Sequence, residues 1–240
     1  MERTAAEVLG TRGTLTVHEQ QELSVISDGK AVLSDREMDE VRAKWCCMDS
    51  FGQRYRECSL SNYDATTDSQ RAAVEVLRQH VLDFPDRNVL IYGPCGTGKD
   101  HLIAGLARSL MQSEWKPSPR GYSLHRHPIG VFDGMSLFDT LRDRISDRDQ
   151  VDLTKDSARY PIVYISDPTP LSGALSQFEQ RHLYRILDAR YRELKPTWMT
   201  CNVSSRDQLD ECIGVRNSER ILDGATSIYC DWPSYRKTNG

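Results

Sequence analysis

The sequence contains no run of about 18 apolar residues, which is the length that a helix needs to cross a bilayer. Its first ten residues, MERTAAEVLG, also lack the basic-then-apolar pattern of an export signal. We therefore expect no membrane partner and a cytoplasmic location.

Paired cysteines and an excess of basic charge are missing as well. The seven cysteines include no CxxC pair, and Cys46, Cys47 and Cys58 are too irregularly spaced for a zinc ribbon, so we expect free thiols. A net charge of −4 and a pI near 5.9 exclude a strongly basic nucleic-acid-binding protein, although a local basic patch could still contact DNA.

The length of 240 residues is enough for one α/β domain of ordinary size and a smaller N-terminal piece. In that piece, Ser34 and Glu37 form a capping box ahead of an apolar stripe at helical spacing. The stripe consists of Met38, Val41, Trp45 and Met48. It either packs on its own domain or docks on another protein, and the sequence leaves both alternatives open.

The most informative stretch follows an apolar run that ends at Tyr92. Residues 93–99 spell GPCGTGK, the GxxxxGK pattern of a Walker A loop, and a helical apolar pattern begins at Leu102. Such a strand-to-helix turn directs backbone N–H groups and the positive end of a helix dipole at phosphates. The alternative is a glycine-rich turn without a ligand. The predicted nucleotide loop consists of Gly93, Pro94, Cys95, Gly96, Thr97, Gly98, Lys99 and Asp100.

One position departs from this pattern, because Asp100 stands where a serine or threonine hydroxyl normally ligates Mg²⁺. A carboxylate binds Mg²⁺ well, but without the metal it repels the phosphates by about 1 to 4 kcal/mol at a distance near 4 Å. We therefore expect binding to depend strongly on Mg²⁺.

Further along the chain, apolar strands alternate with amphipathic helices. The run from Pro161 ends at Asp167, the pattern of a Walker B strand whose acid orients the water shell of the metal, and the strand from Thr197 ends at Asn202. Between them, Ser176 and Glu179 form a capping box that predicts another helix. This alternation predicts a parallel sheet covered on both faces, with the ligand at the edge where the polar strand ends lie.

Several stretches resemble the DnaC-type helicase loaders, small AAA+ ATPases that include the IstB transposition helpers. They are GTGKDHLIAGLA, DARYRELKPTWMTCN, GVRNSER and DWPSYR. The resemblance runs from about Cys58 to Arg236. It implies an α/β P-loop NTPase fold of the AAA+/RecA-like type, with a five-stranded parallel sheet between helices and no C-terminal lid domain. Residues 58–240 would form the ATPase domain and residues 1–57 a partner-binding arm.

The same resemblance assigns roles to single residues. Lys99 would contact the phosphates, Asp167 would be the Walker B acid and, with Asp100, a metal ligand, and Asn202 would be the sensor residue. Arg220 would be the arginine finger, with Arg216 as a second candidate. Where the family has a glutamate after the Walker B aspartate, this chain has Pro168. Losing such a base typically slows hydrolysis by about 10² to 10⁴-fold, so slow turnover is expected.

The resemblance implies an ATP- and Mg²⁺-binding protein that loads or remodels a replicative DNA helicase during replication initiation. Single-stranded DNA would be a further partner, and the protein would form a homo-oligomer when nucleotide is bound. Two alternatives are an IstB-like transposition helper and a nucleotide-binding adaptor that does not hydrolyse ATP; Asp100 and Pro168 favour the adaptor.

Overall fold

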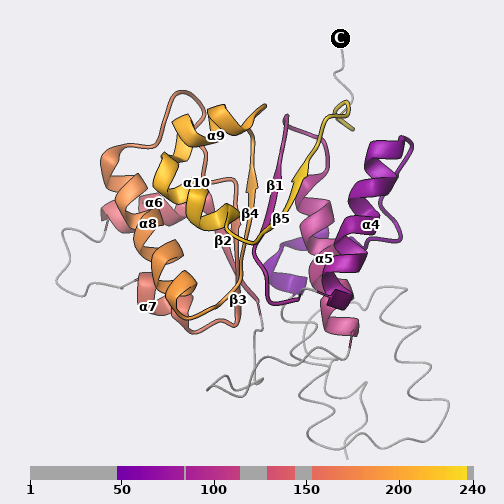
Figure 1. Cartoon of the computed structure of the whole chain (residues 1–240), viewed down its shortest axis with the longest axis horizontal. Helices are drawn as coiled ribbons and strands as arrows, with labels where there is room; N and C mark the ends of the chain where they lie inside the picture. Colours follow the sequence, from indigo (N-terminus) through magenta and orange to yellow (C-terminus); the bar gives the residue numbers. More distant parts are fainter. Residues whose placement is uncertain (1–47, 84, 114–128, 144–152, 237–240) are drawn as a thin grey trace, which may run out of the picture.

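The computed structural model describes residues 48–83, 85–113, 129–143 and 153–236 of the chain (Figure 1). A single five-stranded sheet lies at its centre, and all of its strand pairs are parallel. The strands are β1 Val89–Tyr92, β2 Ile129–Asp133, β3 Ile162–Ser166, β4 Thr197–Cys201 and β5 Thr226–Tyr229. The helices are η1 Gln53–Tyr55, α4 Asp68–Asp83, α5 Lys99–Gln112, α6 Gly134–Asp143, α7 Leu153–Ala158, α8 Gln177–Arg192, α9 Arg206–Ile213 and α10 Val215–Leu222.

The strand order is β2-β3-β4-β1-β5, so the chain leaves β1 near one side of the sheet and returns at its far edge with β2. Ligands of open parallel sheets bind where such a reversal occurs, outside the carboxyl ends of the strands. The register places Ser166 of β3 beside Thr200 of β4, and Tyr92 of β1 beside Cys201. The loops after β1, β3 and β4 therefore leave the sheet at the same edge.

Helices cover both faces of the sheet (Figure 1). On one face α4 and α5 pack in a cluster with Met48 and Phe51, and on the other α6, α8, α9 and α10 form a second cluster. The central strands are buried on both sides, as their continuous apolar runs predict. The predicted five-stranded α/β fold is confirmed. After β5, the described residues continue only to Arg236 and form no further helix.

Local signals explain the boundaries of two helices. Ser176 caps α8 by accepting a hydrogen bond from the Glu179 backbone N–H, and the Glu179 side chain accepts from the Ser176 backbone in return. The predicted capping box is thereby confirmed. The Asp133 carboxylate accepts from the Ser136 backbone N–H at 2.8 Å and caps α6 in the same way.

Arg190 of α8 joins the starts of β3 and β4, at the edge opposite the polar strand ends. Its guanidinium is buried, and burial lowers its pKa to about 9, which leaves it charged at neutral pH. It donates to the carbonyls of Ser157, Tyr160, Pro161 and Pro196 and to the hydroxyl of Thr197. These bonds satisfy the charge without a carboxylate.

Of the predicted N-terminal stripe, only Met48 lies within the described residues. Met48 is 3% exposed and belongs to the core cluster of α4 and α5, which agrees with the packing alternative at this position. Met38, Val41 and Trp45 lie outside the described residues. No helix in the described ranges is long and apolar enough to cross a membrane.

Candidate functional site

The loop between β1 and α5 has the backbone that its glycines predict. Gly93, Gly96 and Gly98 all have positive φ angles, of 146°, 81° and 85°. A side chain at Gly93 would come within 2.6 Å of the Cys230 carbonyl oxygen. Gly98 caps α5 without any side-chain hydrogen bond, so no side chain competes for the first N–H groups of the helix.

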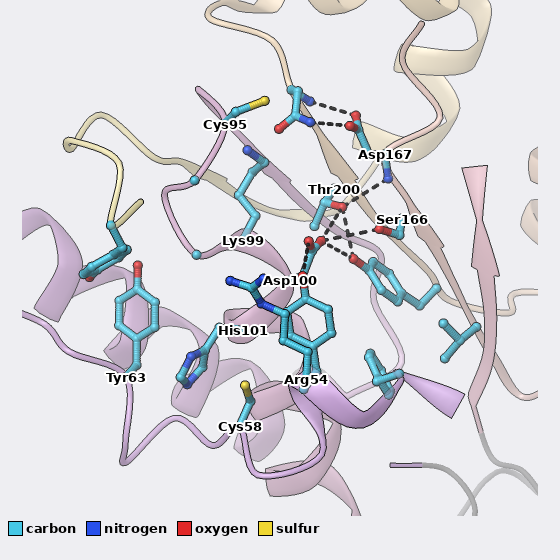
Figure 2. Close-up of a pocket in the computed structure, with 18 of the residues that line it drawn as sticks. Arg54, Cys58, Tyr63, Cys95, Lys99, Asp100, His101, Ser166, Asp167 and Thr200 are labelled. Atoms are coloured by element: carbon cyan, nitrogen blue, oxygen red, sulfur yellow. Dashed lines mark hydrogen bonds between the residues drawn. The ribbon is translucent and has the colours of Figure 1, made fainter. Parts of the chain in front are cut away.

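Lys99 lies under this loop, at the first position of α5. Its ammonium donates to the carbonyl oxygens of Gly93 and Pro94, both at 2.8 Å. Burial lowers its pKa, and the carbonyl contacts hold the charged group at the loop. The loop therefore has a fixed positive charge on its inner side (Figure 2).

The outer side of the loop is braced by distant parts of the chain. The Thr97 carbonyl accepts hydrogen bonds from the Tyr63 hydroxyl and the Trp232 indole, both at 2.8 Å. The Gly96 carbonyl accepts from the Tyr235 backbone N–H at 2.8 Å. Because two loop carbonyls are fixed from outside, residues 231–236 help to set the loop conformation.

A cavity of about 880 Å³ opens between the loop and the polar strand ends, within the range of small-molecule sites in proteins. Figure 2 shows Lys99 below Cys95 of the loop, and Asp100 next to the strand ends Ser166 and Thr200. Aromatic side chains complete the lining, and they are Phe51, Tyr55, Tyr63, Tyr164 and Tyr235. The cavity thus combines a cationic loop, an acidic edge and apolar walls.

Asp100 is surrounded by hydroxyl groups. Its Oδ1 atom accepts from Tyr164 at 2.7 Å and from Thr200 at 3.1 Å, and it lies 3.5 Å from the Ser166 hydroxyl. Its Oδ2 atom accepts from Tyr55 at 3.2 Å. Burial, followed by the neighbouring Asp100 charge, raises the pKa of Tyr164 well above its usual value, so the phenol remains a donor.

Asp167 follows β3 directly and lines the same cavity. Its φ angle of 44° is left-handed, a conformation that aspartate tolerates better than most residues. The carboxylate accepts from the Asn202 backbone N–H at 3.1 Å, from the Asn202 side-chain amide and from the Thr169 hydroxyl. The two strand-end residues that the sequence singled out separately are therefore in contact.

Arg220 lies elsewhere. On α10 it pairs with Asp188 at 3.2 Å, and its guanidinium lies 4.3 Å from the centre of the Tyr191 ring. Arg216 and Arg220 line a separate surface pocket and do not line the cavity beside Lys99. Within one chain, the structure brings Lys99, Asp100, Asp167 and Asn202 together and leaves both arginines apart.

The sequence did not predict several residues of the cavity. Tyr55 belongs to a short 3-10 turn, which has no periodic apolar pattern. Tyr164 lies inside an apolar run, which predicts a buried strand and no polar contact. The DWPSYR stretch, which contains Trp232 and Tyr235, carried part of the family resemblance. Its sequence does not indicate that these two residues contact the loop of residues 93–100. Among the described residues, no group of three His, Cys, Asp or Glu side chains could hold a metal ion.

The strand order, the loop after β1 and the acidic strand ends define the P-loop class of α/β folds. No protein-family model and no curated protein sequence matches the chain. Solved structures of similar fold include the DnaC helicase loader, DnaI and DnaA proteins.

The DnaC helicase loader is similar with a TM-score of 0.61 and 22% identity, over 74% of this chain and 99% of the other. DnaI is similar with a TM-score of 0.57 and 21% identity, over 77% and 93%. DnaA bound to AMPPCP and single-stranded DNA has a TM-score of 0.57 and 16% identity, over 76% and 51%. The chain therefore shares the five-stranded α/β fold of these proteins, as its sequence resemblance implied.

Proposed function

We propose that this protein binds ATP and ADP at the loop of residues 93–100. The observation that carries the proposal is the buried Lys99 ammonium, which is held under a glycine loop at a helix N-terminus without a side-chain cap. Backbone N–H groups and the lysine charge together suit the phosphates of a nucleotide. The AMPPCP bound to a DnaA of similar fold supports a nucleotide of this class.

The residues present also fit a magnesium ion. Mg²⁺ binds through one or two carboxylates together with phosphates and water, so it needs no larger cluster of acidic side chains. Asp100 of α5 and Asp167 at the end of β3 are two of the four acids that line the cavity, and they are the two beside Lys99 and the strand ends; Asp64 and Asp133 are the others. When bound, the metal would neutralise charge on the phosphates.

We propose that hydrolysis is slow in the isolated chain. Asp167, held by Asn202, offers a carboxylate at the strand end, whereas the following Pro168 offers neither a charge nor a donor. Arg220 would have to come from a neighbouring copy, because it does not line the cavity of its own chain. Turnover would thus depend on nucleotide-dependent assembly.

The proposed cellular role is to load or remodel a replicative DNA helicase on DNA, with single-stranded DNA as a second partner. The similar fold of the DnaC helicase loader supports the first partner, and the DNA-bound DnaA supports the second. Residues 1–57 would carry the helicase contact. Their last ten residues also build the core and the cavity, since Met48, Phe51 and Tyr55 pack there.

Isothermal titration with ATP and ADP tests the nucleotide site. Lys99→Ala should weaken binding by roughly a hundredfold or more, because it removes a charge-assisted contact. The matched control is Lys155→Ala, which removes an exposed lysine of α7. Equal affinity of wild type and Lys99→Ala would refute the assignment.

Co-purification with the replicative helicase tests the cellular role. The full chain should retain the helicase, and deletion of residues 1–47 should release it without lowering the melting temperature of the remainder. Deletion should stop at residue 47 because Met48 is part of the core. Capture of a transposase in place of the helicase would support the transposition alternative.

A further inference from the structure

The metal site of P-loop proteins normally combines two groups. A serine or threonine hydroxyl follows the loop lysine, and an aspartate carboxylate stands at the end of the neighbouring strand. Here the carboxylate of Asp100 follows the lysine, and the last residue of β3, which contacts it, is Ser166. The Ser166 hydroxyl donates to Asp100 Oδ1 at 3.5 Å. The hydroxyl and the carboxylate are both present, but each stands on the element that normally holds the other.

The surroundings of Asp100 leave its charge available. All of its hydrogen-bond donors are neutral hydroxyls, from Tyr55, Tyr164, Ser166 and Thr200. In the described part of the chain, Asp100 forms no ion pair with a basic side chain. Neutral donors orient a carboxylate without cancelling its charge, so Asp100 can attract a cation although Lys99, Arg54 and Arg236 line the same cavity.

Asp167 has different hydrogen-bond partners from those of Asp100. Its carboxylate is turned to Asn202 and Thr169, and no hydrogen bond joins it to Asp100. Thr200 lies between the two acids: its hydroxyl donates to Asp100 and accepts from the Asp167 backbone N–H at 3.2 Å (Figure 2).

Pro168 does not face the cavity. It is buried at the start of α6, where a side chain on Gly134 would come within 2.4 Å of the Pro168 Cα atom. The pair of strand-end residues that lines the cavity is therefore Ser166 and Asp167. The sequence pattern predicted Asp167 as the first polar residue of this strand end. In the structure the polar pair begins one position earlier, at Ser166.

We infer that Asp100 and Ser166 hold the magnesium ion of a bound nucleotide as an exchanged pair. Asp167 is then the second polar residue of the strand end, at the position where a carboxylate can orient the attacking water. Asn202 fixes the direction of the Asp167 carboxylate. This inference rests on the proposed nucleotide binding and revises the role that the sequence assigned to Asp167. It also accounts for a carboxylate beside the phosphates: the residue at the end of β3 that contacts Asp100 is a serine, and the carboxylate of the following Asp167 is hydrogen-bonded to Asn202 and Thr169.

The test is to restore the usual arrangement. Binding of mant-ADP is measured by fluorescence with Mg²⁺ and with EDTA, and the ratio of the two Kd values defines the metal gain. Asp100→Thr should lower the metal gain at least about tenfold, because the site loses the carboxylate that follows Lys99 and faces the Ser166 hydroxyl. Adding Ser166→Asp to that variant should return the gain to within about threefold of wild type. Asp100→Asn, which keeps the side-chain shape, should behave as Asp100→Thr does.

The control is Asp167→Asn, which should slow single-turnover hydrolysis while leaving the metal gain within about twofold. Loss of the gain in Asp167→Asn with retention in Asp100→Thr would overturn the inference, as would a double variant no better than Asp100→Thr. Equal binding by wild type in Mg²⁺ and EDTA would refute the metal pair alone. Failure of wild type to bind mant-ADP in either buffer would refute the nucleotide site itself.

Discussion

Asn202 holds the Asp167 carboxylate with two hydrogen bonds, one from its backbone N–H at 3.1 Å and one from its side-chain amide. The first bond is available to any residue except proline at position 202, whereas the second requires the amide. Asn202 therefore contributes to the direction of the carboxylate without contributing to the phosphate loop.

The variant Asn202→Ala distinguishes a role in orienting the Asp167 carboxylate from a role in nucleotide binding. We expect nucleotide affinity to stay within about threefold of wild type and single-turnover hydrolysis to slow by about 10²-fold, because the carboxylate loses its side-chain donor. Thr169→Ala is the matched control, since it removes the other side-chain donor to Asp167 and should cost less. A large loss of affinity in Asn202→Ala would instead assign Asn202 to nucleotide binding.

Arg220→Ala should remove the part of ATP hydrolysis that rises with protein concentration, by about 10³-fold or more. The same variant should leave the urea unfolding midpoint nearly unchanged, because Asp188 keeps its pair with Arg192. Mixing Arg220→Ala with Lys99→Ala should restore activity, since one chain supplies an intact cavity and the other an intact arginine. If the mixture stays inactive while Arg216→Ala alone abolishes turnover, Arg216 is the finger.

The two donors to the Thr97 carbonyl allow a double-mutant test of the brace on the loop. Tyr63→Phe and Trp232→Phe each remove one hydrogen bond and leave the other, so each should weaken ADP binding only about two- to threefold. The double variant leaves the buried carbonyl unpaired, so it should weaken binding by clearly more than the roughly four- to ninefold that additive effects would give. Strictly additive effects would show that the two bonds act independently of the loop conformation.

His80 should make the protein less stable in mild acid. The side chain is buried on α4, its Nδ1 atom lies 2.8 Å from the Thr226 hydroxyl, and burial lowers its pKa from 6.5 to about 4. The unfolded chain thus binds a proton between these values and the folded chain does not, so stability falls as the pH drops from 6.5 towards 4. Between pH 7 and pH 5 the loss should be about 2 kcal/mol.

Urea unfolding at pH 7 and pH 5 measures this loss. His80→Gln should have a correspondingly smaller difference between the two pH values, whatever its absolute stability. The same difference in wild type and His80→Gln would mean that other groups carry the pH dependence.

The sequence predicted correctly those elements that depend on residues close together in the chain. The apolar run before Gly93, the glycines of the loop and the capping box at Ser176 each depend on residues within a few positions, and the observed elements confirm the predicted sheet and helices. The polar ends of β3 and β4 could be placed at one edge because parallel strands end together.

The missed features depend on contacts between distant parts of the chain. Tyr164 was an apolar strand residue in the sequence, and only the fold brings its hydroxyl to Asp100, 64 positions away. Phe51 stacks on the Tyr164 ring with 5.5 Å between centres, although it lies in the stretch expected to belong to the arm. Whether Ser166 or Asp167 faces Asp100 is a question of strand register, which an apolar pattern does not settle.

The left-handed backbone at Asp167 restricts which side chains this position can accept. Glycine, asparagine and aspartate adopt that conformation readily, whereas longer and branched residues do so at a cost of about 1 kcal/mol or more. A random library at position 167, selected first for folding and then for activity, should therefore give two different outcomes. Glycine and asparagine would pass the first selection and fail the second, and glutamate would be disfavoured in the first although it keeps the charge.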